Sequence, residues 1–238
     1  MDPSSPRDPE VSIIIPARNE ERYVRRALAS VVGQTWPPAR LEVLVVDNGS
    51  VDGTAETVRS YMAAHPAHSI RLLHEPVAGV SRAKNRGAGE ARGRWLIFLD
   101  ADSRMAPNLV EQVVRRGGKG YAAGSIPVIA DSCDLIDRGF FALMEFGKRL
   151  FDLQAQMFFC SRAVFTDVGG FAEEIRLAED RDFLARVRGA DWPMCRVSSS
   201  WIATSPRRLH ERPWRLNMFV MFFRWTLANW GFGRRWRY

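Results

Sequence analysis

Two aspartates, one residue apart, follow a continuous apolar run in the segment GRWLIFLDADSRMAPNL, residues 93–109. The apolar run predicts a buried strand that delivers Asp100, Ala101 and Asp102 to its end. Side chains alternate along an extended chain, so we expect Asp100 and Asp102 to share one side. Two such carboxylates repel each other unless a positive charge lies between them. A divalent cation bound to substrate phosphates meets this need, because Mg²⁺ usually takes only one or two protein carboxylates.

A second acidic group lies in RLAEDRDF, residues 176–183. Glu179, Asp180 and Asp182 open a segment with helical spacing. A carboxylate within hydrogen-bond distance of a hydroxyl group can take its proton while the oxygen attacks. Structural interpretations compete for both motifs: acids stabilise helix N-termini, and an Asp-rich turn before a helix needs no cation.

Alternating strand and helix patterns must position these acids. Apolar, β-rich runs begin at residues 11, 41, 70 and 95, and helical spacing fills residues 20–34, 51–65 and 80–91. This order predicts βαβ units and a mostly parallel α/β sheet flanked by helices. The clusters PARNE, DNGS and DADS follow three of the strands, and such sheets bind ligands beyond the strands' carboxyl ends. We expect the three clusters to face one crevice.

The second half of the chain is less regular. A strand is predicted over residues 120–130, a helix over 134–151, a strand with a loop over 155–171 and a helix over 177–190. The chain has 238 residues and is 46% hydrophobic, enough for one large or two small domains with a real core.

Cysteine usage and the N-terminus favour a reducing cytosol. Cys133, Cys160 and Cys195 form no CxxC pair, which argues against a disulfide framework or a thiolate zinc site. The start, MDPSSPRDPE, has neither the basic region nor the apolar region of a secretory signal.

The formal net charge of +7 lies in the aromatic C-terminal segment, residues 205–238, which has eight arginines and one acid, Glu211. The rest of the chain is neutral, so a nucleic-acid partner is not expected. The 17 residues from Trp214 to Trp230 fall short of the ~20 that span a bilayer. Arginine mixed with aromatic residues favours attachment to an anionic membrane surface. Packing on the domain and a homodimer contact are the alternatives.

Taken in order, the motifs resemble those of family-2 glycosyltransferases, inverting enzymes of the GT-A fold that use nucleotide sugars. The resemblance covers residues 11–190. It rests on Pro16-Ala17-Arg18-Asn19-Glu20, DNGSVDGT from Asp47, GVSRAKNRG from Gly79, the DAD segment, Gly169-Gly170-Phe171 and Glu179-Asp180.

The resemblance implies a role for each matching residue on the donor side. Contacts with the nucleotide sugar fall to Pro16, Arg18, Glu20, Asp47, Asn48, Arg82, Lys84, Asp100 and Ala101. Many members have aspartate where this chain has Asn48. An amide both donates and accepts hydrogen bonds, so UDP is not assumed as the donor nucleotide.

Further roles concern the metal and the acceptor. The resemblance implies that Asp102 binds a divalent metal, Mg²⁺ or Mn²⁺, and that Asp180 is the catalytic base, supported by Glu179 and Asp182. His210 completes the metal shell or is a surface histidine. Arg207 and Arg208 are further candidates for contact with the diphosphate, since guanidinium groups suit phosphate.

The sequence thus predicts a glycosyltransferase that moves a sugar from a nucleotide-diphosphate donor to a hydroxyl acceptor, which is a sugar, a lipid-linked molecule or a small molecule. The expected GT-A domain covers residues 1–204, with a nucleotide-binding half (11–104) and an acceptor-side half (105–204), followed by the helical tail 205–238. The expected location is cytoplasmic, peripheral at the inner face of the membrane, with a role in the cell envelope.

Three other functions stay open. A retaining transferase shares the GT-A fold. A nucleotidyltransferase would want a basic, Gly-rich loop after the first strand, where this chain has the acidic PARNEE. A non-catalytic carbohydrate- or membrane-binding module would not need Asp100, Asp102 and Asp180.

Overall fold

A computed structural model of the chain describes residues 9–150, 157–175 and 178–210, together with 217, 220 and 223. The strands within these residues are β1 (Val11–Ala17), β2 (Leu41–Asp47), β3 (Ser69–His74), β4 (Trp95–Phe98), β5 (Ser103–Met105), β6 (Ala123–Ser125), β7 (Val128–Ala130), β8 (Phe158–Ser161), β9 (Met194–Arg196) and β10 (Ile202–Thr204).

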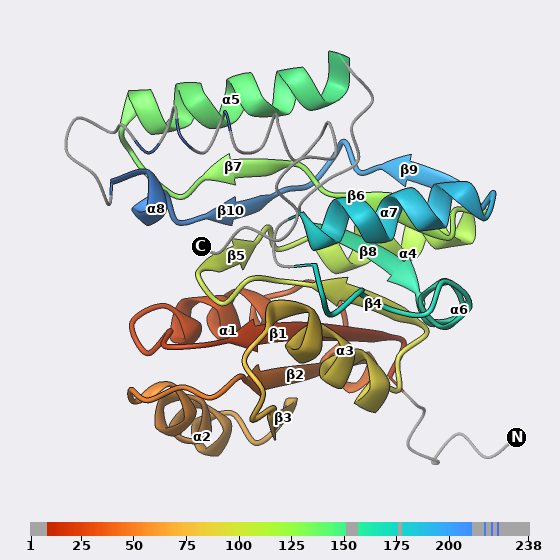
Figure 1. The fold of residues 1–238 in the computed structure, drawn as a ribbon. Coiled ribbons are helices and arrows are strands. Elements are labelled where there is room, and N and C mark those ends of the chain that lie inside the picture. Colours follow the sequence, from red (N-terminus) through yellow and green to blue (C-terminus); the bar gives the residue numbers. More distant parts are fainter. Residues whose placement is uncertain are drawn as a thin grey trace, which may run out of the picture.

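A mostly parallel sheet forms the centre of the molecule, as predicted. Its strand order is β3-β2-β1-β4-β8-β6-β9, and a smaller sheet has the order β5-β10-β7. Strands β1 to β4 are parallel, whereas β8 runs antiparallel to both β4 and β6. The carboxyl ends of β1, β2 and β4 therefore meet at one edge of the sheet (Figure 1).

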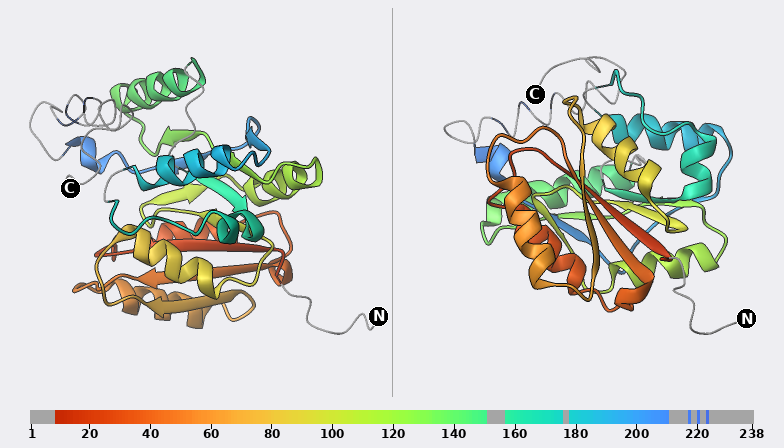
Figure 2. Two further views of the ribbon diagram at one scale, coloured as in Figure 1. Left: turned by 45° about the vertical axis from the view of Figure 1, so that its right-hand side comes forward. Right: turned by 90° about the horizontal axis from the view of Figure 1, so that it is seen from below.

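Helices cover both faces of the central sheet (Figure 2). They are α1 (Val24–Val32), the 3₁₀ turn η1 (Pro38–Arg40), α2 (Thr54–Ala64), α3 (Val80–Glu90), α4 (Leu109–Gly118), α5 (Leu135–Leu150), α6 (Arg162–Asp167), α7 (Glu179–Gly189) and α8 (Arg207–His210).

The side-chain alternation of β1 divides the core into two layers. Ile13 and Ile15 belong to the apolar layer formed with α1, α2 and α4. Ile14, on the opposite face, belongs to the layer formed with α3, α6 and α7. Because alternate residues of a strand point to opposite faces, a strand buried on both sides is mostly apolar, as the run VSIII is. Its one polar residue, Ser12, is buried and donates a hydrogen bond to Glu42 at 2.6 Å.

The structure confirms the predicted strand–helix order of the first half and corrects the second. The strand expected over 120–130 is split into β6 and β7, which belong to different sheets. Pro127 lies at the break, and proline cannot donate a ladder hydrogen bond. The loop expected after β8 contains α6, and α4, β9 and β10 were not predicted.

Most of the segment 205–238 lies outside the described residues, so its predicted helical character and membrane role are not tested. Its first residues form α8, which follows β10 directly. Among the described residues, no helix combines the length and the apolar character needed to cross a membrane.

Candidate active site

Asp100 and Asp102 lie in a tight turn. The Ser103 amide donates to the carbonyl oxygen of Asp100 at 2.9 Å, and the chain then enters β5 in the smaller sheet. The prediction that both aspartates share one side of an extended chain is therefore wrong, because β4 ends at Phe98 and the backbone must turn to reach the second sheet. The two carboxylates lie close to different cations, Lys84 and Arg207.

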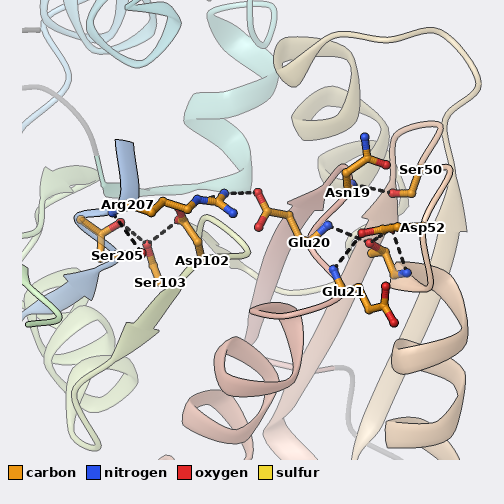
Figure 3. Close-up of polar contacts among 11 residues, drawn as sticks. Asn19, Glu20, Glu21, Ser50, Asp52, Asp102, Ser103, Ser205 and Arg207 are labelled. Atoms are coloured by element: carbon orange, nitrogen blue, oxygen red, sulfur yellow. Dashed lines mark hydrogen bonds and ion pairs between the residues drawn. The ribbon is translucent and has the colours of Figure 1, made fainter. Parts of the chain in front are cut away.

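Arg207 of α8 joins the ends of β1 and β4 (Figure 3). Its guanidinium group pairs with Glu20 and, at 3.1 Å, with Asp102. It also lies 4.4 Å above the centre of the Tyr23 ring. The second carboxylate oxygen of Glu20, Oε2, is buried and accepts no hydrogen bond from the described residues. One arginine thus neutralises two acids that come from distant parts of the sequence.

Burial raises the pKa of both Asp100 and Asp102 above the ordinary value. For Asp100 the charge of Lys84 is the main opposing influence, and for Asp102 it is that of Arg207. Arg208 acts on both carboxyl groups in the same direction. The turn is therefore an acidic site whose charge is balanced by protein cations.

A divalent cation fits the chemistry of this turn. The described residues contain no group of three or more His, Cys, Asp or Glu side chains that could hold a metal by themselves. Mg²⁺, however, usually takes only one or two carboxylates and completes its shell with water and substrate phosphates. Asp100 and Asp102, with the unpartnered oxygen of Glu20 nearby, supply the oxygen ligands that such an ion prefers.

Lys84 connects this turn to the second acidic motif. Its ammonium group is buried and lies 2.9 Å from Glu179 Oε1 and 2.5 Å from Asp180 Oδ1. Asp100 is close enough to contribute to the pKa shifts of both Lys84 and Asp180. We call Lys84, Asp100, Glu179 and Asp180 the Lys84 cluster. The fold therefore brings acids from both motifs close to one buried lysine.

Asp180 has the electrostatics of a base that works near neutral pH. Burial raises the pKa of Asp180 to about 7, although the positive charge of Lys84 acts against the rise. Burial alone would lower the pKa of Lys84, but attraction by Asp180 and Glu179 raises it, so the lysine stays protonated. The Asp180 side chain is 21% exposed, so solvent or a ligand can reach it.

The backbone before Asp180 is in a rare conformation. Ala178, which precedes α7, has φ 63° and ψ 34°, the left-handed region. An L-residue other than glycine, asparagine or aspartate is seldom found there, and such positions cluster at functional sites. The turn places Glu179 and Asp180 in the first turn of α7, where the helix dipole also favours carboxylates.

Helix α3 holds the loop that precedes Asp180. Asn85 Nδ2 donates to the carbonyl oxygen of Phe171 at 2.9 Å, and the Phe171 amide donates to Asn85 Oδ1 at 2.8 Å. Gly170 has φ 69°, and a Cβ there would lie 2.9 Å from Asn85 Oδ1. Gly170 is thus required both by its backbone conformation and by the close approach of Asn85.

Two more side chains of α3 contact the same loop. Arg82, predicted to contact the nucleotide, pairs with Glu173 at 2.8 Å. The Ser81 hydroxyl donates to the carbonyl oxygen of Ile175 at 3.3 Å. Sequence reasoning missed Glu173, because no local pattern relates a residue on α3 to one about 90 positions later.

Asn48 organises the loop between β3 and α3. Its Nδ2 group donates to the carbonyl oxygens of Glu75 and Val77 at 3.0 and 2.8 Å, and its Oδ1 accepts from the Gly79 amide at 2.8 Å. All three bonds stay within the protein. Asp47, beside it, accepts from the Ser50 amide at 3.1 Å and closes the DNGS turn.

We expect Asn48→Asp to destabilise the protein by about 1–3 kcal/mol, because a carboxylate cannot donate to the Glu75 and Val77 carbonyl groups and would leave them unsatisfied. Chemical denaturation measures the change in unfolding free energy. Asn19→Asp is the matched control, since Asn19 Oδ1 only accepts, from the Val51 amide. Equal stabilities of the two variants would contradict this role of Asn48.

The remaining predicted residues lie in varied environments. The ring nitrogen Nε2 of His210 is 2.9 Å from Asp137 Oδ1, so the contact described for His210 is with α5 and not with Asp102. Asp182 pairs with Arg186 along α7 at 3.0 Å. Pro16 lies within β1, and Arg18 is exposed just after it.

A cavity of about 440 Å³ adjoins Arg207 at the carboxyl edge of the sheet. Its lining comes from the loops after β1 and β2 and from α8, through Asn19, Glu21, Arg22, Tyr23, Asp52 and Arg207. The two loops are held together because the Asn19 amide donates to Ser50 Oγ at 3.0 Å (Figure 3). PARNE and DNGS therefore meet as predicted.

Comparison with known proteins gives a consistent result. The model of the family described as "Glycosyl transferase family 2" matches residues 12–171. Glycosyltransferase AglE of Haloferax volcanii is 43% identical over 94 residues, a match that covers 40% of this chain and 31% of AglE. This chain spans less than half the length of the curated relatives it matches first.

Two solved structures share the fold. S. aureus TarS, solved with UDP-GlcNAc, has a TM-score of 0.69 at 19% identity, covering 82% of this chain and 58% of that one. Mannosyltransferase PcManGT from Pyrobaculum calidifontis, solved with GDP-Man and Mn²⁺, has a TM-score of 0.70 at 22% identity, covering 94% of this chain and 66% of that one.

Proposed function

Because the chain belongs to glycosyl transferase family 2, we propose that it is a GT-A enzyme that transfers a sugar from a nucleoside-diphosphate donor to a hydroxyl acceptor, with inversion at the anomeric carbon. The observation that carries the proposal is the Lys84 cluster, which joins the carboxylate of the DAD turn to that of α7. The nucleotide sugars bound by TarS and PcManGT support the class of donor, and they differ in base and sugar.

Asp180 acts as the base in this proposal. Its carboxylate takes the proton of the acceptor hydroxyl while that oxygen bonds to the anomeric carbon and the bond to the donor diphosphate breaks. Lys84, 2.5 Å away, favours the ionised carboxylate that the step needs. Two neighbouring acids would hold the base in place. Glu179 pairs with Lys84, and Asp182 pairs with Arg186.

The donor diphosphate would lie at the DAD turn. Asp102, with Asp100, would hold a divalent cation, Mg²⁺ or Mn²⁺, which neutralises charge on the leaving diphosphate. Arg207 and Arg208 would contact the diphosphate, since guanidinium groups bind phosphate oxygens well. A metal role for His210 requires that it leave Asp137.

The nucleotide side of the site would be shaped by Pro16, Arg18, Glu20, Asp47, Asn48 and Arg82. Asn48 would act through the 75–79 loop, which it holds by hydrogen bonds. We place the reaction in the cytoplasm. The transferase domain in this proposal is residues 1–204, with Arg207 of the following segment reaching back to the site.

The test is a donor panel with and without metal. With Mn²⁺ present, we expect one nucleotide sugar of the panel to stabilise the fold. At a nucleotide-sugar concentration of about 100 times its dissociation constant, the stabilisation should be about 2.7 kcal/mol, or roughly 5–10 °C in Tm. Release of nucleoside diphosphate should stop in EDTA and return with Mn²⁺ or Mg²⁺. Full activity in EDTA would contradict the proposed role of a metal. If no nucleotide sugar of the panel stabilised the fold, the proposed transferase function would be contradicted. The anomeric configuration of the product distinguishes inversion from retention.

A further inference from the structure

Helix α5 buries three charged residues and exposes five large apolar ones. Leu135, Ile136, Leu143, Phe146 and Leu150 are between 59 and 78% exposed. Residues three or four apart share one face of a helix, so these side chains form one stripe, which we call the α5 stripe. A helix that packs on a soluble domain normally has the opposite distribution.

Buried ion pairs fix this orientation. On the inner side, Asp137 accepts from the Ser132 hydroxyl at 2.8 Å and contacts His210 Nε2 at 2.9 Å. Glu145 pairs with Lys148 at 2.5 Å and with Arg196 at 3.4 Å. Rotating α5 to hide its stripe would expose or separate these pairs, and an unpaired buried charge is strongly destabilising. The helix is therefore held with its apolar face outward.

The exposed charges of α5 are all positive. Of its five ionisable side chains, Asp137, Glu145 and Lys148 are buried, which leaves Arg138 and Arg149 exposed. The helix lies at the outer side of the molecule beyond β7, and both the first view and the 45° view show it there (Figures 1 and 2). An apolar face bordered by arginine is the pattern of helices that lie in an anionic membrane interface.

We propose that the α5 stripe inserts into the boundary between headgroups and acyl chains of an anionic lipid bilayer. A second copy of the chain fits less well, because a two-fold contact through this face would bring the exposed arginines of both copies to one interface with no exposed acid on α5 to pair with them. Six arginines and one acid follow α8 in residues 211–238, which adds to the attraction for an anionic surface. The proposal does not depend on the reaction that the site carries out.

Vesicle cosedimentation of the full chain tests this directly. We expect binding to phosphatidylcholine vesicles that contain phosphatidylglycerol, and much weaker binding to pure phosphatidylcholine. Leu143→Glu/Phe146→Glu should lower the partition coefficient at least tenfold. The matched control, Ser60→Glu/Ala63→Glu, adds the same two charges at the same spacing to exposed positions of α2 and should change it less than threefold.

A second variant separates apolar contact from charge. Leu143→Ser/Phe146→Ser adds no charge, and we expect it also to reduce binding at least tenfold while circular dichroism and Tm stay near the original values. Equal binding by the wild type and both α5 variants, or no binding by the wild type, would overturn the proposal. So would a wild-type dimer that becomes monomeric in the variants without any vesicle binding, since the stripe would then be a contact between copies.

Discussion

Asp180→Asn is expected to lower turnover by roughly 10²–10⁴-fold, the usual contribution of a positioned general base. Asparagine has nearly the same shape as aspartate but cannot take the proton of an acceptor hydroxyl. The Asp180 carboxylate meets the requirements of the role: it is partly exposed at the start of α7, and one of its oxygens lies 2.5 Å from Lys84. Turnover is measured as release of nucleoside diphosphate with the donor that the panel identifies.

Donor affinity of the same variant should stay within about threefold of the original, because the donor is assigned to the DAD turn and not to α7. Calorimetric titration with the donor and Mn²⁺ measures it. Glu56→Gln is a matched control, since Glu56 is an acid in the first turn of α2, exposed and away from the site. Near-normal turnover of Asp180→Asn would show that Asp180 is not the base. A loss of donor affinity as large as the loss of turnover would show that Asp180 binds the donor instead.

Removing the buried cation of the Lys84 cluster should shift the pH dependence of the reaction. With Asp180 at a pKa of about 7, the ionised base forms as pH rises, so kcat/KM should increase through about pH 7 and then level off. Lys84→Met removes the charge that favours the carboxylate over the neutral acid. The acid limb should therefore move by about 1–3 pH units to higher pH, the usual effect of a nearby opposite charge.

The same variant should lose stability, and more so at high pH. Glu179 and Asp180 would lose their buried partner, Asp100 would lose a nearby positive charge, and breaking a buried pair costs about 3–5 kcal/mol. A carboxyl group whose pKa is raised on folding binds protons more tightly in the folded state. Its unfavourable contribution is small below the unfolded pKa near 4 and grows as pH rises through the folded value, about 7 for Asp180 in the wild type. We expect Tm of Lys84→Met to fall between pH 5 and pH 8 more steeply than that of the wild type.

Lys84→Arg is the control for both effects, because it keeps the positive charge and should keep the acid limb near its original pH. Lys84→Met could leave the acid limb of the pH profile in place and lower kcat by the same factor at every pH. Lys84 would then hold the geometry of α7 without setting the pKa of Asp180. If it changed neither the limb nor the stability, the Lys84 cluster would have no role in catalysis or folding.

The first half of the fold could be predicted because its signals are local. Strands such as VSIII and LEVLVV are buried on both faces and are apolar except for Ser12 and Glu42, and the helices between them have helical apolar spacing. The second half could not be predicted as well, because its strands are only three or four residues long and one of them is antiparallel to its neighbours. Pro127 was the visible signal for the break between β6 and β7.

The sequence was enough to predict which residues belong to the candidate site, but not which of them contact each other. The motifs named Lys84, Asp100, Glu179 and Asp180, but only the structure pairs Lys84 with acids 95 and 96 positions away. Residue types also conceal roles. The resemblance implied a nucleobase contact for Asn48, yet both donor hydrogens of its side-chain amide bond to the 75–79 loop, and the partner of His210 is Asp137.

The bonds between α3 and residues 170–180 have a mechanical consequence. The buried pair of Lys84 and Asp180, the paired bonds of Asn85 and Phe171, and the contact of Arg82 with Glu173 all start from one turn of α3. Moving Phe171, Glu173 and Asp180 away from α3 would break all of these bonds together. We therefore expect the residues around Asp180 to move with α3 as one body.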